Sequence, residues 1–190
     1  MKNAVMNTIV LLLATFGNVV MAADTAALEA KIAELQAQVD AYETERAQTT
    51  KNLERFRQLD LVAFNNRNWD LIKDIHHEDV VAQGADGVVS NGMVPAHEWD
   101  LKFLFETFPD FTIHEHLITF GYGGWTAGLS RSTGTFTQPM KLRDGTVIEP
   151  TGKMFEFTAI TLARWEDGRI MEEYIYWDNN HLFNQLGINQ

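Results

Sequence analysis

The first hydrophobic pattern along the chain is typical of an export signal. Lys2 is the only charge before residue 24, and an unbroken apolar run covers residues 9–14. Residues 20–22 then supply the small or tolerated side chains of a cleavage site. The apolar core is too short to cross roughly 30 Å of bilayer hydrocarbon comfortably. We therefore expect a signal peptide over residues 1–22 and a periplasmic or secreted mature protein, with an uncleaved N-terminal anchor as the alternative.

The next segment, residues 23–50, predicts a helical arm. Its apolar positions follow alternating steps of four and three residues, the a/d spacing of a coiled coil. They are Leu28, Ile32, Leu35, Val39 and Tyr42. The residues between them are good helix formers, mainly Ala, Glu, Gln and Lys. Two interpretations stay open, a dimerisation arm and a solvated helical spacer that leads to the domain.

The hydrophobic pattern from residue 51 to residue 108 predicts helices. A broad apolar face covers residues 53–64, and a second short helix is expected over residues 69–75. A third is expected from Pro95 to Phe108, with Pro95 in its first turn and Pro109 just past its end. A short strand at residues 79–82 separates the second helix from the third.

After Pro109 the pattern changes to strands. Four runs rich in aromatic and β-branched residues follow, at residues 111–118, 125–136, 153–165 and 169–177. Glu166-Asp167-Gly168 between the last two is a strong hairpin signal. Helices followed by antiparallel strands predict an α+β domain over residues 51–190, with helices packed on one face of a curved sheet. A strongly curved sheet of this kind forms a cone with a pocket between sheet and helices.

Composition narrows the function classes. The 190 residues carry a net charge of −11, which disfavours nucleic acid and anionic lipid surfaces as partners. There is no cysteine, which excludes disulfides, cysteine nucleophiles, iron–sulfur clusters and thiolate zinc sites. Neither a nucleophile elbow nor a phosphate-binding glycine loop occurs in the sequence.

Five short motifs occur in order over the globular part. They are Phe108-Pro109-Asp110, Gly134-Thr135-Phe136, Pro150-Thr151-Gly152-Lys153, the stretch from Arg164 to Ile170, and Trp177-Asp178-Asn179 ahead of Gln185-Leu186-Gly187. With them the stretch from Leu53 to Gly187 resembles the nuclear transport factor 2-like superfamily, and within it the SnoaL-like polyketide-cyclase or ester-cyclase family. The resemblance implies a cone-shaped α+β barrel with a deep pocket and frequent homodimerisation, and it leaves the activity open because this fold hosts several.

The resemblance also suggests an acid–base residue. In the cyclases the Asp of the last strand's Trp-Asp segment acts as general acid and base, and Asp178 matches that position. A carboxyl group that faces an apolar cavity has its pKa raised and can exchange protons with a substrate without a metal or cofactor. The alternative is structural, because Asp is a favoured N-cap and Asp178 precedes a short helix.

Strand alternation then gives the expected neighbours of Asp178. If Asp178 faces the pocket, so do Tyr176, Tyr174 and Glu172. The two tyrosines would supply aromatic walls. On the third helix, His97 is the expected helper that polarises a carbonyl or bonds Asp178, with a hydrogen-bonded histidine at the pocket rim as the alternative. Trp99 and Trp125 are further wall candidates, with ordinary core packing as the alternative.

Two histidine-rich stretches were tested as metal sites. In a regular strand His114 and His116 share one face, and residues 76–79 read His-His-Glu-Asp. No helical His-Glu-x-x-His motif occurs and no further ligand is apparent, so the sequence predicts neither a metal nor a cofactor.

Two functions are consistent with these observations. The leading hypothesis is an exported SnoaL-like protein that binds a small hydrophobic, carbonyl-bearing molecule and cyclises or isomerises it by cofactor-free acid–base chemistry. The alternative is a secreted ligand-binding or assembly module without chemistry. A homodimer is expected in either case.

Overall fold

The computed structural model describes the backbone of residues 2–188 and the side chains of residues 24–188. Residues 1–44 form one compact unit and residues 45–190 a second, and helix α1 (Lys2–Gln58) contributes to both. The predicted signal peptide covers residues 1–22, whose side chains are outside the described part of the chain. Its cleavage therefore stays a prediction. Across the described part of the chain, no helix is both long and apolar enough to cross a membrane.

In the first unit, the predicted arm is helical. Its a/d side chains are all exposed, namely Leu28, Ile32, Leu35, Val39 and Tyr42. On the rest of this segment polar side chains pair along the helix, as Lys31 does with Glu34 at 2.8 Å. Both interpretations of the arm therefore remain predictions.

The helical part of the second unit follows the expected order. Its elements are the end of α1, η1 (Leu59–Phe64), α2 (Trp69–Ile75), η2 (Met93–His97), α3 (Glu98–Thr107) and α4 (Asn179–Leu186). The predicted limits of α2 are confirmed, and Asn68 caps this helix by accepting a hydrogen bond from the Leu71 N–H. The predicted third helix begins in the π-helical turn η2, where Val94, just before Pro95, has extended backbone angles, and it continues as α3 to Thr107, one residue short of the predicted end.

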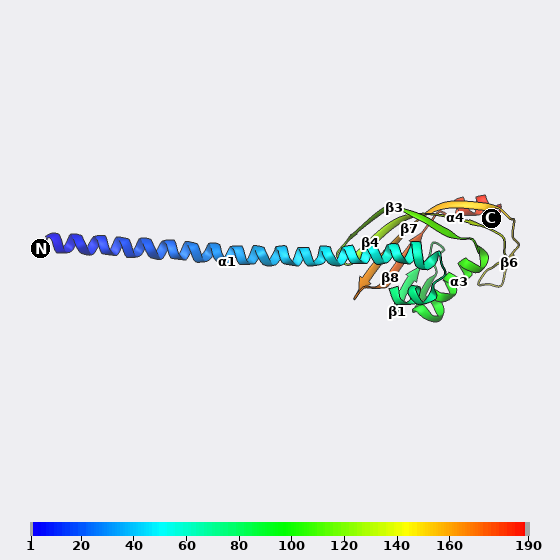
Figure 1. The fold of residues 1–190 in the computed structure, drawn as a ribbon, viewed down its shortest axis with the longest axis horizontal. Coiled ribbons are helices and arrows are strands. Elements are labelled where there is room, and N and C mark those ends of the chain that lie inside the picture. The colour runs from blue at the N-terminus through cyan, green and yellow to red at the C-terminus, as the bar shows by residue number, and fades with distance from the viewer. Residues whose placement is uncertain (1, 189–190) are drawn as a thin grey trace. The chain divides into compact units, whose positions relative to one another are not determined.

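Within the described residues, eight strands form two sheets. They are β1 (His76–Gln83), β2 (Val89–Asn91), β3 (Thr112–Tyr122), β4 (Trp125–Thr135), β5 (Met140–Lys141), β6 (Val147–Ile148), β7 (Met154–Glu166) and β8 (Arg169–Tyr176). The main sheet has the order β2-β1-β8-β7-β4-β3, and only β1 and β8 pair in parallel. Figure 1 shows this sheet curving around the end of α1. The α+β class predicted from the sequence is confirmed.

The hairpin between β7 and β8 has the predicted turn. Asp167 and Gly168 both have positive φ angles, 47° and 75°, as a two-residue hairpin turn requires. Along β7 the burial alternates, so that Ala159, Thr161 and Ala163 face the helices and are buried. We call this the inner face of the sheet, and the opposite side the outer face.

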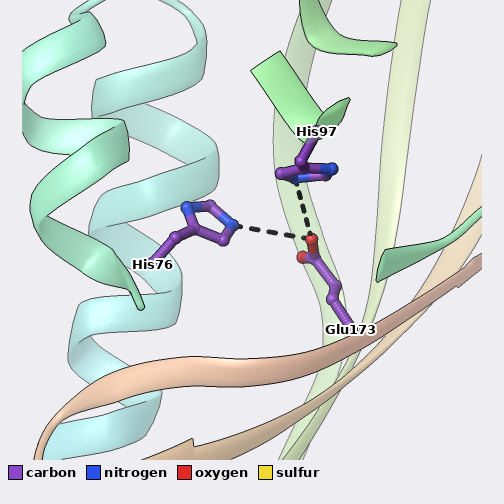
Figure 2. Close-up of side chains that lie close together, drawn as sticks. All are labelled: His76, His97 and Glu173. Carbon is purple, nitrogen blue, oxygen red and sulfur yellow. Dashed lines mark ion pairs between the residues drawn. The ribbon is translucent and has the colours of Figure 1, made fainter. Parts of the chain in front are cut away.

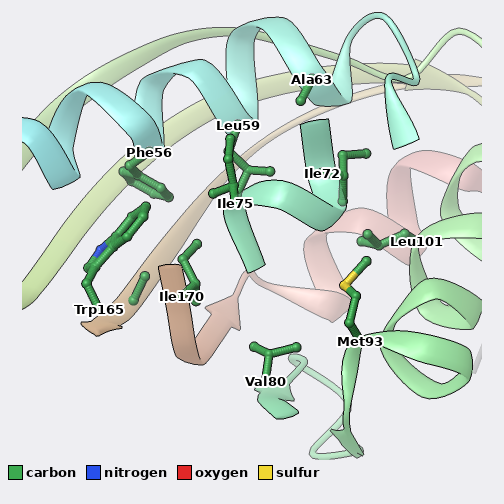
Figure 3. Packing of buried hydrophobic residues seen from close by; sticks show 11 residues of the cluster. Phe56, Leu59, Ala63, Ile72, Ile75, Val80, Met93, Leu101, Trp165 and Ile170 are labelled. Carbon is green, nitrogen blue, oxygen red and sulfur yellow. The ribbon is translucent and has the colours of Figure 1, made fainter. Parts of the chain in front are cut away.

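The core fills the space between the helices and the inner face. In one cluster Phe56 and Leu59 reach from the helical layer toward Trp165 and Ile170 of the sheet (Figure 3). A second cluster surrounds Phe155 and Phe136 at the other end of the sheet. Gly134 is required there, because a Cβ atom at this position would lie 2.6 Å from the Phe155 ring. The helices are thus held against one face, and polar groups between the layers are buried.

Candidate active site

The strand β8 carries the carboxylate that is most deeply placed between the layers. Glu173 pairs across the ladder with the buried Ala163 and is itself only 5% exposed, so it points to the inner face. Two histidines approach it from the helical side. His76 is the first residue of β1, directly after α2, and His97 is the last residue of η2. We call these three residues the His–Glu–His cluster.

Both imidazoles of this cluster point at the same carboxylate oxygen. The Nε2 atoms of His76 and His97 lie 3.6 and 3.5 Å from Oε2 of Glu173 (Figure 2). These distances exceed those of a hydrogen bond. Neither Nε2 atom has a hydrogen-bond partner among the residues that the structure describes, although both atoms are buried. Three polar atoms therefore converge without bonding one another.

The opposite nitrogen of each ring is held by the fold. Nδ1 of His76 lies 2.7 Å from the backbone carbonyl of Ile72 in the preceding helical turn. Because a carbonyl oxygen can only accept, Nδ1 carries the proton and donates it. Nδ1 of His97 lies 3.5 Å from the Ser90 hydroxyl, a longer contact. These bonds orient the rings and aim the Nε2 atoms at Glu173.

Burial sets the charges of the cluster. Desolvation lowers the pKa of His97 to about 4, although Glu173 acts in the opposite direction. Desolvation acts to raise the pKa of Glu173, but the neighbouring His76 and His97 outweigh it, so this pKa lies below its usual value. At neutral pH the cluster thus holds an ionised Glu173 beside a neutral His97.

A second buried pair lies nearby, formed by Asp60 of η1 and His116 of β3. Nε2 of His116 lies 2.8 Å from Oδ2 of Asp60, so the imidazole N–H donates to the carboxylate. The Phe56 ring stacks on His116 with ring centroids 5.1 Å apart. Desolvation raises the pKa of Asp60 against the effect of His116, and the charge of Glu173 raises it further. We call these two residues the Asp–His pair.

A bulge in β3 brings His116 to this position. The register against β4 shifts between Ile113 and Glu115 and again between His116 and Ile118. As a result His116 faces inward while His114 is exposed and contacts the Thr133 hydroxyl at 2.8 Å. The expectation that His114 and His116 share one face was wrong, because it assumed a regular strand.

Asp178 lies away from both groups. It is exposed, and its Oδ1 accepts a hydrogen bond of 2.9 Å from the His181 N–H at the start of α4. The capping alternative is therefore confirmed as its structural role, and its catalytic role stays a prediction. His97 is buried in the interior and faces Glu173, not Asp178, so its predicted catalytic role stays a prediction.

The predicted aromatic walls also lie elsewhere. Since Glu173 faces inward, its neighbour Tyr174 faces outward, where it stacks on Trp125 with ring centroids 6.4 Å apart. Tyr176 is 41% exposed on the same outer face. Trp99 stacks on Phe103, lies under the Arg143 guanidinium and is also 41% exposed. The predicted placement of the two tyrosines beside an inward-facing Asp178 was wrong, because the inner and outer faces were exchanged.

Sequence reasoning missed two residues of the interior. Asp60 interrupts the apolar segment from Leu59 to Phe64, and a lone acid on a buried helical face is a signal that could have identified it. The sequence does not single out Glu173 in this way, because Glu172 beside it carries the same side chain.

One open depression of about 360 Å³ lies on the second unit. It is lined by Gln48, Asn52, Gly124, Trp165, Asp167 and Gly168. None of the predicted site residues borders it.

The fold and interior agree with one protein family. The family model described as SnoaL-like polyketide cyclase matches residues 54–186, and the chain belongs to this family. No curated protein sequence matches the chain significantly.

Solved structures show the same fold. A protein described as a SnoaL-like polyketide cyclase from Jannaschia sp. CCS1 is 19% identical, with a TM-score of 0.64 over 75% of this chain and 95% of its own. IdmH from Streptomyces antibioticus, described as a polyketide cyclase, is 23% identical, with a TM-score of 0.58 over 72% and 98%. A ketosteroid-isomerase-like protein from Catenulispora acidiphila, solved with trimethylamine, is 14% identical, with a TM-score of 0.54 over 68% and 89%.

Proposed function

We propose that this protein is an exported acid–base catalyst that binds a small hydrophobic molecule carrying a carbonyl group and cyclises or isomerises it. The observation that carries the proposal is the 2.8 Å hydrogen bond between Asp60 and His116 inside a SnoaL-like fold. Among the five interior ionisable side chains, Asp60 keeps the largest exposure, 10%. Asp60 is therefore the least enclosed ionisable group of the interior.

The chemistry follows from the environment of this pair. Burial raises the pKa of Asp60, which makes its carboxylate a stronger base than an exposed aspartate. The carboxylate takes a proton from the carbon next to the carbonyl group and leaves an enolate. His116 donates a hydrogen bond to the carboxylate and holds it in one orientation. Phe56 supplies an apolar wall against His116.

Two products are open to this enolate. In an intramolecular aldol closure, the enolate carbon forms a C–C bond to a second carbonyl carbon of the same molecule. The oxygen of that carbonyl then takes the proton back from Asp60. In an isomerisation the proton returns to a different carbon. Both routes return the pair to its starting state and change no oxidation state overall.

Proton exchange at carbon tests the step that both routes share. We would incubate the protein in D₂O with 2-tetralone, acetophenone and 4-phenyl-2-butanone, and follow loss of the α-proton signals by NMR. The expected result is exchange faster than in buffer for at least one ketone. Asp60→Asn should slow it by about 10²–10⁴-fold, the usual contribution of a positioned acid or base.

Two further variants separate the candidates. Glu149→Gln removes an exposed carboxylate and should leave exchange unchanged. Asp178→Asn should also leave it unchanged if Asp60 is the base. Loss of exchange in Asp178→Asn, with Asp60→Asn still active, would transfer the role to Asp178.

The non-catalytic alternative has its own supporting observation. The apolar stripe of the first unit is exposed, with Leu28 and Ile32 each at 65%. A stripe of this kind favours an assembly role through a second helix. If no ketone exchanges faster than in buffer, and deletion of residues 24–44 abolishes oligomers, the assembly module becomes the better description.

A further inference from the structure

We propose that the His–Glu–His cluster is a binding site for one divalent transition-metal ion, with Nε2 of His76, Nε2 of His97 and a carboxylate oxygen of Glu173 as ligands. The three ligand atoms lie within 4.8 Å of one another, and all three residues are buried. Figure 2 shows both rings directed at the same carboxylate. The inference is independent of the proposed function, which rests on Asp60 and His116.

The distances within the cluster suit a shared cation better than direct contact. A direct N–H···O hydrogen bond would bring nitrogen and oxygen to about 2.9 Å. A metal ion with bonds of about 2.0–2.2 Å to each ligand separates them by about 3.3–3.8 Å at tetrahedral to trigonal angles. The separations from Glu173 Oε2 are 3.6 Å for His76 and 3.5 Å for His97. Two of the three separations between ligand atoms therefore match those of a coordination shell, and the third is within 4.8 Å.

Unpaired atoms support the same conclusion. Nδ1 of His76 donates to the Ile72 carbonyl, and Nε2 of the same ring is buried, faces the Glu173 carboxylate and has no hydrogen-bond partner among the described residues. Burying a polar atom without a partner is unfavourable. Nε2 of His97 is also buried without a hydrogen-bond partner in the described residues. A metal ion would satisfy all three atoms at once.

The surroundings of the rings match those of metal-ligating histidines. Such histidines usually donate their second ring N–H to a carbonyl, carboxylate or water, which fixes the tautomer. His76 has this arrangement with Ile72, and the Ser90 hydroxyl lies beside Nδ1 of His97. Each ligand comes from a defined backbone position, at an α2–β1 junction, a π-helical turn and a central strand. The ligand directions are therefore fixed by the fold.

The ligand set indicates the class of metal. Two imidazoles and one carboxylate suit Zn²⁺ or Fe²⁺, whereas Ca²⁺ and Mg²⁺ prefer oxygen ligands. Three protein ligands leave a coordination position free for water or a substrate oxygen, as in catalytic zinc sites. Neither histidine-rich stretch of the sequence could reveal this ligand set, because the three ligands are far apart along the chain. His97 comes 21 positions after His76, and Glu173 comes 76 positions after His97.

Zinc binding to the full chain tests the site. The protein would be produced without a histidine tag, stripped with EDTA and titrated with Zn²⁺ by calorimetry, with bound zinc counted by mass spectrometry of the metal. We expect one Zn²⁺ per chain. At about one hundred times Kd, zinc should raise Tm by about 5–10 °C. Co²⁺ in place of Zn²⁺ should give the strong visible bands of a low-coordinate site.

Matched variants identify the ligands. Glu173→Gln keeps the shape of the side chain and should weaken zinc binding by more than about 100-fold. Loss of a residue that only supports a ligand costs up to about 100-fold, so a larger loss identifies Glu173 as a direct ligand. Glu106→Gln, an exposed carboxylate, should bind like the wild type. His97→Gln should lose binding, whereas His77→Gln, the partly exposed neighbour of His76, should retain it. Circular dichroism would establish that each variant is folded.

A measurement on the unaltered protein covers the case in which a cluster variant does not fold. In long-range ¹H–¹⁵N spectra of ¹⁵N-histidine-labelled protein, Zn²⁺ should move the Nε2 signals of two of the six histidines and leave their Nδ1 atoms protonated. An adventitious surface ion would instead move exposed histidines and be retained by Glu173→Gln. Unchanged Nε2 signals, or no stoichiometric zinc, would show that the cluster is a metal-free structural group and overturn the inference.

Discussion

Individual side chains in this molecule act through the backbone groups that they contact. Asp178 is the clearest example, since its carboxylate accepts the His181 N–H and begins α4. Asp110 acts in the same way on a strand, where its carboxylate accepts from both the backbone and the hydroxyl of Thr135 at 2.7 and 2.6 Å. Both aspartates belong to the five short motifs named in the sequence analysis. Motif residues of this type need not touch a substrate to be required.

The capping role of Asp178 can be measured by substitution. Asp178→Ala should lower the free energy of unfolding by about 1 kcal/mol, because the His181 N–H loses its acceptor. Asp178→Asn should change it little, since asparagine caps equally well. Urea denaturation of the two variants checks this. A loss of similar size in both would mean that the negative charge itself, and not the cap, stabilises the fold.

At the scale of elements, the Asp110 contact ties the loop after α3 to the end of β4. Beside it Phe108 packs on Phe155, with ring centroids 4.8 Å apart. Burial acts to raise the pKa of Asp110, but the two bonds from Thr135 outweigh it, so the pKa lies below its usual value. A carboxyl group with a lowered pKa in the folded state stabilises the fold only while it is ionised.

The lowered pKa of Asp110 determines how stability depends on pH. The contribution of Asp110 should be fully present above the unfolded pKa of about 3.9 and be lost as the pH falls through the lower folded value. At pH 7, Asp110→Asn should lower Tm by about 2–4 °C, equivalent to about 1 kcal/mol for this exposed group. Thermal unfolding from pH 7 to pH 2.5 should show the two proteins converging at the acid end. A constant difference would contradict an ionic contribution.

The elements also show what the sequence could and could not predict. Helix α2 and the β7–β8 hairpin follow from local signals, namely the Asn68 cap and the Asp167-Gly168 turn. The orientation of β8 does not, because alternation shows which residues share a face without showing which face is inward. The outer face carries apolar residues too, among them Leu162 and Ile160. Anchoring the pattern on Asp178 therefore exchanged the two faces and concealed Glu173.

At the scale of the whole molecule, packing the helices on the inner face of the sheet leaves apolar side chains exposed on its outer face. Cross-strand partners place exposed apolar side chains from four strands on one side, namely Ile118, Phe120, Tyr122, Trp125, Ile160, Leu162 and Tyr176. A contiguous exposed apolar face of this kind is typical of a protein interface. We propose a second copy of the chain as its partner, because the face can pack on itself about a two-fold axis.

Substitution within this face tests the proposed dimer. Ile160→Arg should shift the protein from dimer to monomer at micromolar concentration, because it places a charge among apolar groups. Analytical ultracentrifugation would report the mass, with Glu149→Arg as a control on an exposed loop. The chain without residues 24–44 should remain dimeric, since the sheet face lies in the second unit. A dimer that survives Ile160→Arg but not the deletion would assign assembly to the arm.

The bulge in β3 has a consequence for how such interiors change during evolution. Two histidines lie two positions apart, and the irregular register between Ile113 and Ile118 selects which of them enters the core. If the same residues paired in regular register from Ile113, His116 would lie on the outer face and Asp60 would lose its partner, with no change in the identity of any residue. In a strand of this kind, the register of the chain determines the chemistry of the interior. Small insertions and deletions are then a route to new activities, distinct from replacement of side chains.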